Sequence, residues 1–184
     1  MDSSFKHHFL ISMPNLAGTY FGDSLIYLCE HNAEGAMGLM VNRASRLELS
    51  DVAEALNLPK PPPNTEAMLV EGGPVSPEQG FVLHSDDAQF ADSQTIAPGI
   101  MLASSRDAVE CLIGLEPPAH AIIALGYSGW GPGQLEQEIE DDAWLTVEAS
   151  RSILFGAPLK TRLHQAASQL GIDMRLMARQ TGHA

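Results

Sequence analysis

The sequence predicts an α+β protein in which helices lie against a mixed sheet. Short apolar runs separated by Gly, Pro or Asn recur along the chain and indicate strands. Only some of the connections between them have the apolar spacing of a helix. Many strands with few intervening helices favour a mixed sheet over a doubly wound one. The length of 184 residues predicts a single compact domain over residues 1–184.

The strands are identified by apolar runs that end at turn residues. The expected strands span residues 9–13, 25–30, 36–42, 67–71, 80–84, 94–97, 100–103, 121–125 and 144–147. The second and third form a hairpin pattern, because a short polar turn joins them. The run at 121–125 does not alternate with polar residues, which is typical of a strand buried on both faces. These strands supply the expected core.

Four helices are expected between and after the strands. Ser50 suits the N-cap of the first helix, and Ser104 with Asp107 resembles a capping box for the second. Pro132 suits the first turn of the third helix, which carries an acidic run. The fourth is expected over 159–170, where apolar residues have helical spacing and Gly171 provides the stop.

The charge of the chain is strongly acidic and unevenly spread. The formal net charge is −13. Residues 1–150 hold five Lys and Arg against 22 Asp and Glu, whereas residues 151–184 hold five Lys and Arg against one Asp. The overall negative charge of the chain repels the phosphate backbone of DNA. Five cations over the last 34 residues are typical of a solvated helix face, so direct nucleic-acid binding is not expected.

Composition and segment lengths predict a cytoplasmic location. The hydrophobic content of 45% is ordinary for a globular protein, and no apolar run is long enough to cross a bilayer. The N-terminus lacks the basic start and apolar stretch of a signal peptide. Cys29 and Cys111 lie far apart without metal-type spacing, so we expect buried free thiols in a reducing compartment and no membrane association.

The sequence contains only partial matches to catalytic, cofactor-binding and metal-binding motifs. Ser128 sits in the setting of a nucleophile elbow, but Trp130 occupies the place of the second Gly. The glycines after Trp130 do not form a dinucleotide fingerprint, and no phosphate-cradling loop is present, so no cofactor is expected. Cys29 and His31 are expected to share one strand face, with His84 at another strand end, but too few ligands accompany them for zinc.

A better candidate site is the group of polar and aromatic residues at the ends of the strands. The candidate ligand-binding cleft comprises Glu30, His31, Asn32, Asn42, Glu71, Gly72, Gly73, His84, Tyr127 and Trp130. A carboxylate–imidazole pair in such a cleft can transfer protons near neutral pH. The two glycines would let a ligand or partner backbone approach closely. The alternative, that these side chains only satisfy the backbone of loops, stays open.

With these segments in place, the chain resembles the YqgE/AlgH family, an uncharacterised bacterial protein family. The matching segments are residues 9–14, 21–42, 71–75, 80–84, 126–136, 144–145, 170–173 and 182–184. The resemblance implies a compact α+β domain with a partly closed β-barrel surrounded by helices. It implies no settled activity, although one branch carries a name linked to transcriptional regulation of alginate synthesis. Gly131-Pro132 departs from several relatives, which have an acidic or small residue after the Trp.

Three functions of different classes follow. The favoured one is a binding or regulatory protein that recognises a peptide or a small polar ligand at the strand ends. The alternative is a hydrolase or acid–base enzyme that uses Glu30 or Glu71 with His31 or His84. The third, a DNA-binding regulator, is disfavoured by the charge and by the lack of a helix-turn-helix with a basic second helix.

Overall fold

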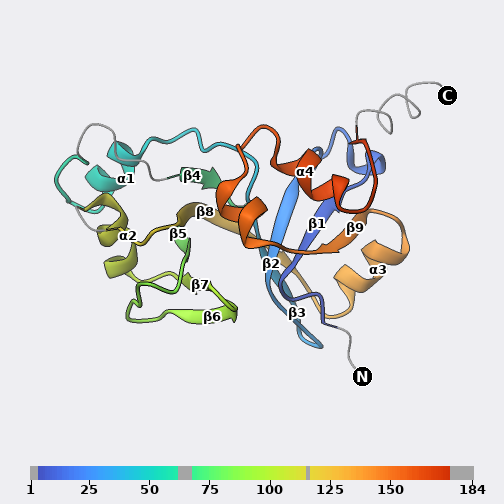
Figure 1. The fold of residues 1–184 in the computed structure, drawn as a ribbon, viewed down its shortest axis with the longest axis horizontal. Helices are drawn as coiled ribbons and strands as arrows, with labels where there is room; N and C mark the ends of the chain where they lie inside the picture. Colours follow the sequence, from blue (N-terminus) through green and yellow to red (C-terminus); the bar gives the residue numbers. More distant parts are fainter. Residues whose placement is uncertain (1–3, 62–67, 115–116, 175–184) are drawn as a thin grey trace. The chain divides into compact units, whose positions relative to one another are not determined.

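The chain divides into two compact units in a computed structural model of the protein (Figure 1). The structure describes residues 4–61, 68–114 and 117–174. Unit 1 comprises Met1–Asn42 and Gly129–Ala184, and unit 2 comprises Arg43–Ser128. The expectation of one domain over residues 1–184 therefore stays a prediction, and the two units are described separately.

Unit 1 is built on an antiparallel sheet. Its strands are β1 (His8–Ser12), β2 (Leu25–Asn32), β3 (Gly35–Met40) and β9 (Trp144–Glu148). They pair in the order β3-β2-β1-β9. The predicted hairpin at 25–42 is thus confirmed. A short 3-10 helix, η1 (Pro14–Leu16), follows β1 and has Pro14 as its first residue.

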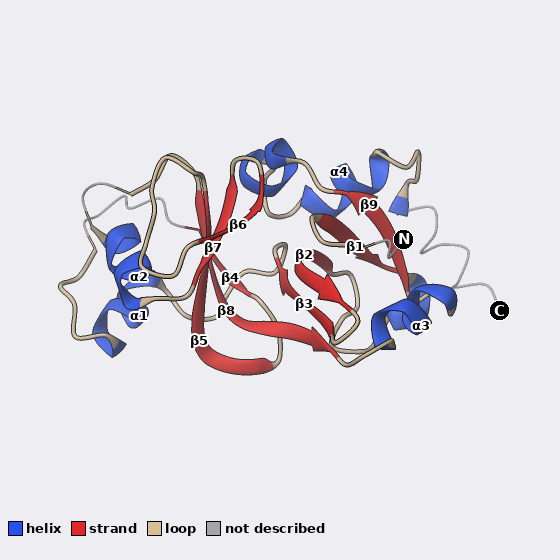
Figure 2. Cartoon of the chain, turned by 90° about the horizontal axis from the view of Figure 1, so that it is seen from below, coloured by secondary structure: helices blue, strands red, loops and turns tan. Residues whose placement is uncertain are grey.

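Helices cover both faces of the unit 1 sheet. Figure 2 shows α3 (Gln134–Glu140) and α4 (Arg162–Ser168) on opposite sides of it. On the α3 face, Leu10, Ile26 and Met40 form a cluster with Leu135 of that helix. Helix α4 packs against β1. A sheet buried on both faces explains why its strands read as continuous apolar runs rather than alternating ones.

Burial shifts the pKa of two ionisable side chains of unit 1, the buried Arg162 and the half-buried Glu138. Arg162 of α4 is fully buried, and its guanidinium donates hydrogen bonds to the carbonyls of Val41 (2.6 Å) and Ala157 (2.7 Å). Burial lowers the pKa of Arg162 to about 10. Burial also raises the pKa of Glu138 on α3, a shift that the nearby indoles of Trp130 and Trp144 oppose only in part.

A bulge at Cys29 changes the faces of the hairpin. Leu28 pairs with Gly38 and Glu30 with Met37, so Cys29 is one extra residue in β2. Beyond the bulge the alternation of side chains is reset, and His31 lies on the α3 face with Ile26 and Leu28 rather than opposite them. The expectation that Cys29 and His31 share one face was therefore wrong.

Unit 2 holds a mixed sheet. Its strands are β4 (Met68–Glu71), β5 (Val75–His84), β6 (Gln94–Ala97), β7 (Ile100–Ala103) and β8 (Ala121–Trp130), the last of which ends in unit 1. They pair in the order β6-β7-β5-β8-β4, and only β4 with β8 is parallel. Helices α1 (Leu49–Ala55) and α2 (Arg106–Ile113) bury Ala53, Val109 and Leu112 against Val82 and Ile123.

The α+β class is confirmed, whereas details differ from the sequence expectation. Within each unit the described strands form an open sheet rather than a closed barrel. The N-caps of α1 and α2 are Glu48 and Ser105, one or two residues away from the predicted Ser50 and Ser104. Strand β8 continues beyond its predicted end at residue 125, and Gly126 inside it has a φ of +76°.

No helix of the described segments is long and apolar enough to span a membrane.

Candidate functional site

The predicted site residues are distributed over both units. Unit 1 contains Glu30, His31, Asn32, Asn42 and Trp130, and unit 2 contains Glu71, Gly72, Gly73, His84 and Tyr127. Whether all ten form one cleft therefore stays a prediction. The surroundings of each group within its own unit determine what its side chains can do.

Three of the unit 1 residues line one small pocket. Glu30, Asn32 and Trp130 enclose it together with the turn of the hairpin and the start of β3. The remaining lining residues are Glu34, Gly35, Ala36 and Met37. The cavity measures about 210 Å³, and two acidic residues, Glu30 and Glu34, line it. We call this cavity the hairpin pocket.

A close contact between the hairpin turn and the end of β8 shapes the hairpin pocket. A Cβ atom at Gly35 would lie 2.2 Å from the backbone oxygen of Trp130, and the φ of Gly35 is +136°. Both facts require glycine at this position. The turn is therefore held directly against the backbone of Trp130, which fixes this side of the pocket.

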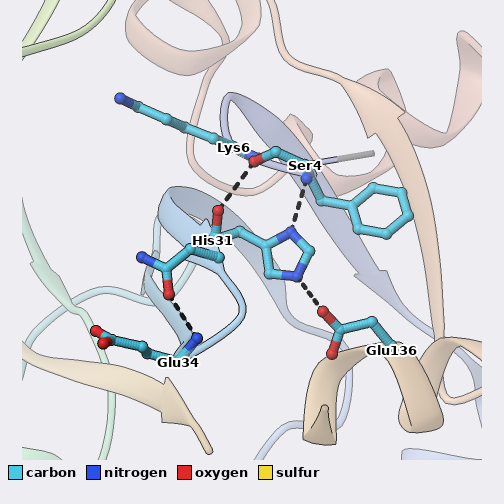
Figure 3. A network of polar contacts seen from close by, with 7 residues as sticks. Ser4, Lys6, His31, Glu34 and Glu136 are labelled. Atoms are coloured by element: carbon cyan, nitrogen blue, oxygen red, sulfur yellow. Dashed lines mark hydrogen bonds and ion pairs between the residues drawn. The ribbon is translucent and has the colours of Figure 1, made fainter. Parts of the chain in front are cut away.

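His31 does not face the hairpin pocket but joins the N-terminal segment to α3 (Figure 3). Its side chain is only 5% exposed. Nδ1 accepts a hydrogen bond from the backbone N–H of Phe5 at 2.8 Å, and the Phe5 ring stacks on the imidazole at 5.5 Å between centroids. Since Nδ1 is an acceptor, the proton of the neutral ring lies on Nε2, which points to the carboxylate of Glu136.

The partner of His31 was not among the predicted site residues. The hydrogen bond from His31 is the main cause that lowers the pKa of Glu136. Both ring nitrogens of His31 are therefore engaged, one by a backbone donor and one by a carboxylate. A general base needs a free acceptor nitrogen, so this geometry disfavours the proposed catalytic use of His31 with Glu30 or Glu71. No spacing in the sequence indicates the Glu136 contact, because 105 residues separate the two.

Asn42 has a structural position at the other end of the hairpin. Its side-chain oxygen accepts the N–H of Leu25 at 2.8 Å, and its amide nitrogen donates to the carbonyl of Asp23 at 2.9 Å. These two bonds connect Asn42, the second residue after β3, to the entrance of β2. Asn42 therefore lies far along the hairpin from Glu30 and Asn32.

In unit 2, His84 is an interior residue. It is fully buried, with its Nδ1 near the carbonyl of Ser85 (2.8 Å) and its Nε2 near Oγ of Ser93 (3.0 Å). A carbonyl can only accept, so Nδ1 carries the proton and Nε2 accepts from the Ser93 hydroxyl. Phe90 packs edge-on against the ring. Burial and complete hydrogen bonding argue against a role for His84 in an accessible cleft.

The two glycines of unit 2 face the chain itself. A Cβ atom at Gly73 would lie 2.1 Å from the backbone of Tyr127 in β8. Gly72 donates its N–H to Leu125 and accepts a hydrogen bond from the buried Ser128 hydroxyl. The space next to Gly73, expected to admit a ligand, is thus occupied by β8. Ser128 is fully buried, which agrees with the rejection of a nucleophile elbow.

The last two predicted residues flank this contact. Glu71 ends β4 beside Leu125 and donates its backbone N–H to the carbonyl of Arg43. The ring of Tyr127 packs against Phe81 at 5.7 Å. Unit 2 thus brings Glu71, the two glycines and Tyr127 together as a packed junction around β8.

Both cysteines are free thiols, but Cys111 is only half-buried, so the expectation of buried thiols holds for Cys29 alone. Cys29 is buried in β2, and burial raises the pKa of its thiol, so the reactive thiolate is disfavoured. Among the described residues, no group of three or more His, Cys, Asp or Glu side chains could hold a metal ion.

Comparison with known proteins identifies the relatives of this chain. A family model described as AlgH-like matches residues 9–175. A UPF0301 protein of Saccharophagus degradans is 44% identical over 181 residues, which cover 98% of this chain and 89% of the relative. A UPF0301 protein of Stutzerimonas stutzeri is 45% identical over 184 residues, which cover 99% and 97%.

Solved structures agree with this result. The solution structure of the AlgH protein from Pseudomonas aeruginosa is 40% identical, with a TM-score of 0.81 and coverage of 100% of this chain and 98% of that one. A crystal structure of a protein from Corynebacterium diphtheriae has a TM-score of 0.72 at 18% identity, covering 97% and 93%, and shows the shared fold alone. The chain therefore belongs to the AlgH-like family.

Proposed function

We propose that this protein is a binding protein whose hairpin pocket takes a positively charged side chain of a partner peptide, such as that of Arg or Lys. The observation that carries the proposal is that Glu30, Asn32 and Trp130 line one cavity together with Glu34. Carboxylates and an amide oxygen beside one another are groups that recognise a guanidinium or ammonium group.

The polar groups of the pocket are available for a ligand. The side chains of Glu30 and Glu34 are exposed, and within the described segments their carboxylates form no hydrogen bond or ion pair. Asn32 uses its oxygen to accept the N–H of Glu34 at 2.8 Å, which leaves its amide N–H groups for a partner. The structural interpretation of Asn32, as a turn residue, and the binding interpretation are therefore compatible.

The size of the pocket favours a peptide side chain over a larger metabolite. A volume of about 210 Å³ lies below the range of roughly 300–1,000 Å³ that is usual for sites of drug-sized ligands. It can hold the end of one side chain, while the rest of a peptide lies outside. The net charge of −13 also attracts basic partners over distance and repels nucleic acid, so a regulatory role would act through a bound protein.

Calorimetric titration with short Arg-containing peptides tests the proposal. We expect saturable binding that weakens as salt is added and a loss of about tenfold or more in affinity in the variant Glu30→Gln/Glu34→Gln. The control variant Glu140→Gln/Glu148→Gln removes the same charge from exposed positions of unit 1 and should bind like the parent. Equal losses in both variants, or equal binding of a peptide with Glu in place of Arg, would refute the proposal.

A further inference from the structure

A second cavity lies at the opposite end of the hairpin in unit 1. It measures about 470 Å³, within the usual range for small-ligand sites. Its walls include the apolar side chains of Met13, Leu159, Leu163 and Met174. Strand β2 has eight residues, so roughly 25 Å of extended chain separates this cavity from the hairpin pocket.

Charged groups of both signs line the same cavity. Asp23 precedes β2 and provides a carboxylate, while Lys160 and His164 provide an ammonium group and an imidazole. All three are exposed at the rim. Lys160 belongs to residues 151–184, which hold five Lys and Arg against one Asp in this otherwise acidic chain. The cavity thus combines an apolar interior with opposite charges at its opening.

The backbone at Asp23 is held in a rare conformation. Its φ is +53°, in the left-handed region that non-glycine residues seldom occupy. Asn42, which also lines the cavity, donates its amide N–H to the Asp23 carbonyl at 2.9 Å. Residues held in this region concentrate at ligand-binding positions, because the surrounding structure must compensate for their cost. The hydrogen bond therefore holds the backbone of Asp23 in place beside the cavity.

A buried hydroxyl is a further polar group of the cavity. Ser12 is 2% exposed and lines the cavity, and its Oγ accepts the backbone N–H of Ser24 at 2.9 Å. Among the described residues, no acceptor is found for the hydroxyl proton of Ser12. A buried donor of this kind normally has a partner, and a ligand in the cavity could provide it.

From these four observations we infer that this cavity binds a zwitterionic ligand with an apolar side chain, the chemistry of a free apolar amino acid. The ammonium group of the ligand pairs with Asp23, and its carboxylate pairs with Lys160 and accepts from Ser12. The apolar side chain lies against the leucines and methionines of the wall. An anionic fatty chain would leave the Asp23 carboxylate facing a like charge, and an alkylamine would leave Lys160 unpaired.

Titration of the full chain with leucine and methionine tests this inference, with amide chemical shifts and heat as the readouts. We expect saturable binding and shifts of the amides of Met13, Asp23 and Leu163. Two leucine analogues are the matched ligands: 4-methylpentanoate lacks the ammonium group, and 3-methylbutylamine lacks the carboxylate. Each should bind about tenfold or more weakly, since each loses one charge pair.

Two variants separate the site from the rest of the protein. Asp23→Asn keeps a residue type that tolerates the left-handed backbone, and Lys160→Met keeps the length of the stem. Each should weaken leucine binding by about tenfold, whereas Arg151→Met, an exposed control on the same segment, should not. Absence of saturable binding, unchanged affinity in both site variants, or equal affinity for the analogues would overturn the inference. Failure of the peptide proposal would leave these results unaffected, because the two sites differ in residues.

Discussion

The replacement His31→Ala should lower the stability of the protein without weakening peptide binding at the hairpin pocket. His31 connects two parts of unit 1 that are far apart in sequence, the N-terminal segment and α3. The nearby Glu30 faces the pocket instead. If this assignment is correct, one residue of the polar cluster is structural and its neighbour is functional.

The size of the effect follows from the contacts that His31 makes. Loss of the 2.8 Å bond leaves the part-buried Phe5 N–H unpaired, which costs about 1–2 kcal/mol. The bond to Glu136 contributes less than about 1 kcal/mol, because that side chain is 45% exposed. Stacking on Phe5 adds about 0.5–1 kcal/mol. A total near 2–3 kcal/mol corresponds to a fall of roughly 5–10 °C in melting temperature for a chain of this size.

Thermal and urea unfolding of His31→Ala, Glu136→Gln and the double variant measure this directly. The lowered pKa of Glu136 means that its contribution is present above the ordinary Glu pKa and is lost as pH falls through the lowered value. The coupling energy between the two residues should therefore be found near neutral pH and disappear in acid. Glu140→Gln, an exposed change on the same helix, is the control. A stable His31→Ala protein that no longer binds peptide would refute the assignment.

Three interior substitutions give further expectations, each measured by unfolding. Arg162→Met removes a buried guanidinium that donates to two backbone carbonyls, so the free energy of unfolding should fall by about 2–5 kcal/mol; an unchanged value would contradict its structural role. Gly73→Ala puts a Cβ 2.1 Å from the Tyr127 backbone and should cost about 3 kcal/mol or more, whereas Gly80→Ala, with its nearest atom at 3.7 Å, should cost less than about 1 kcal/mol. Glu138 has a raised pKa, so its contribution is present below the ordinary Glu pKa and is lost as pH rises; Glu138→Gln should therefore be more stable than the parent near neutral pH and lose this advantage in acid.

Much of the secondary structure could be predicted because it depends on local patterns. The hairpin strands were recognisable from two apolar runs around a polar turn, and the structure has them as β2 and β3. The helix over Arg162–Ser168 could be predicted from the spacing of its apolar residues and from the stop signal Gly171. The structure gives Gly171 a φ of +73°. Such signals lie within one segment and need no knowledge of the rest of the fold.

The positions of side chains were harder to predict where one extra residue changes the register. The bulge at Cys29 moves His31 to the face of α3, and no residue type in β2 indicates that bulge. Alternation alone would have placed His31 beside Cys29. The contact with Glu136 is also nonlocal, so it depends on the packing of α3 on the sheet.

Glycine roles could be recognised only in part. The sequence predicted that Gly72 and Gly73 would let a ligand or partner backbone approach closely, whereas the backbone that lies against Gly73 is that of Tyr127 in β8 of the same chain. Likewise, a His at a strand end is equally compatible with a binding site and with an interior position. Full burial and two hydrogen bonds show that His84 is an interior residue.

The most direct test of the proposed function is a two-dimensional amide spectrum recorded while a blocked arginine derivative is added. Saturable shifts confined to the amides of Glu30, Asn32, Gly35 and Trp130 are the predicted result, because these residues line the hairpin pocket. The same addition to Glu30→Gln/Glu34→Gln should move none of them. Shifts that are absent, or that are equal in the parent and in this variant, would contradict the proposal that the hairpin pocket recognises a basic side chain.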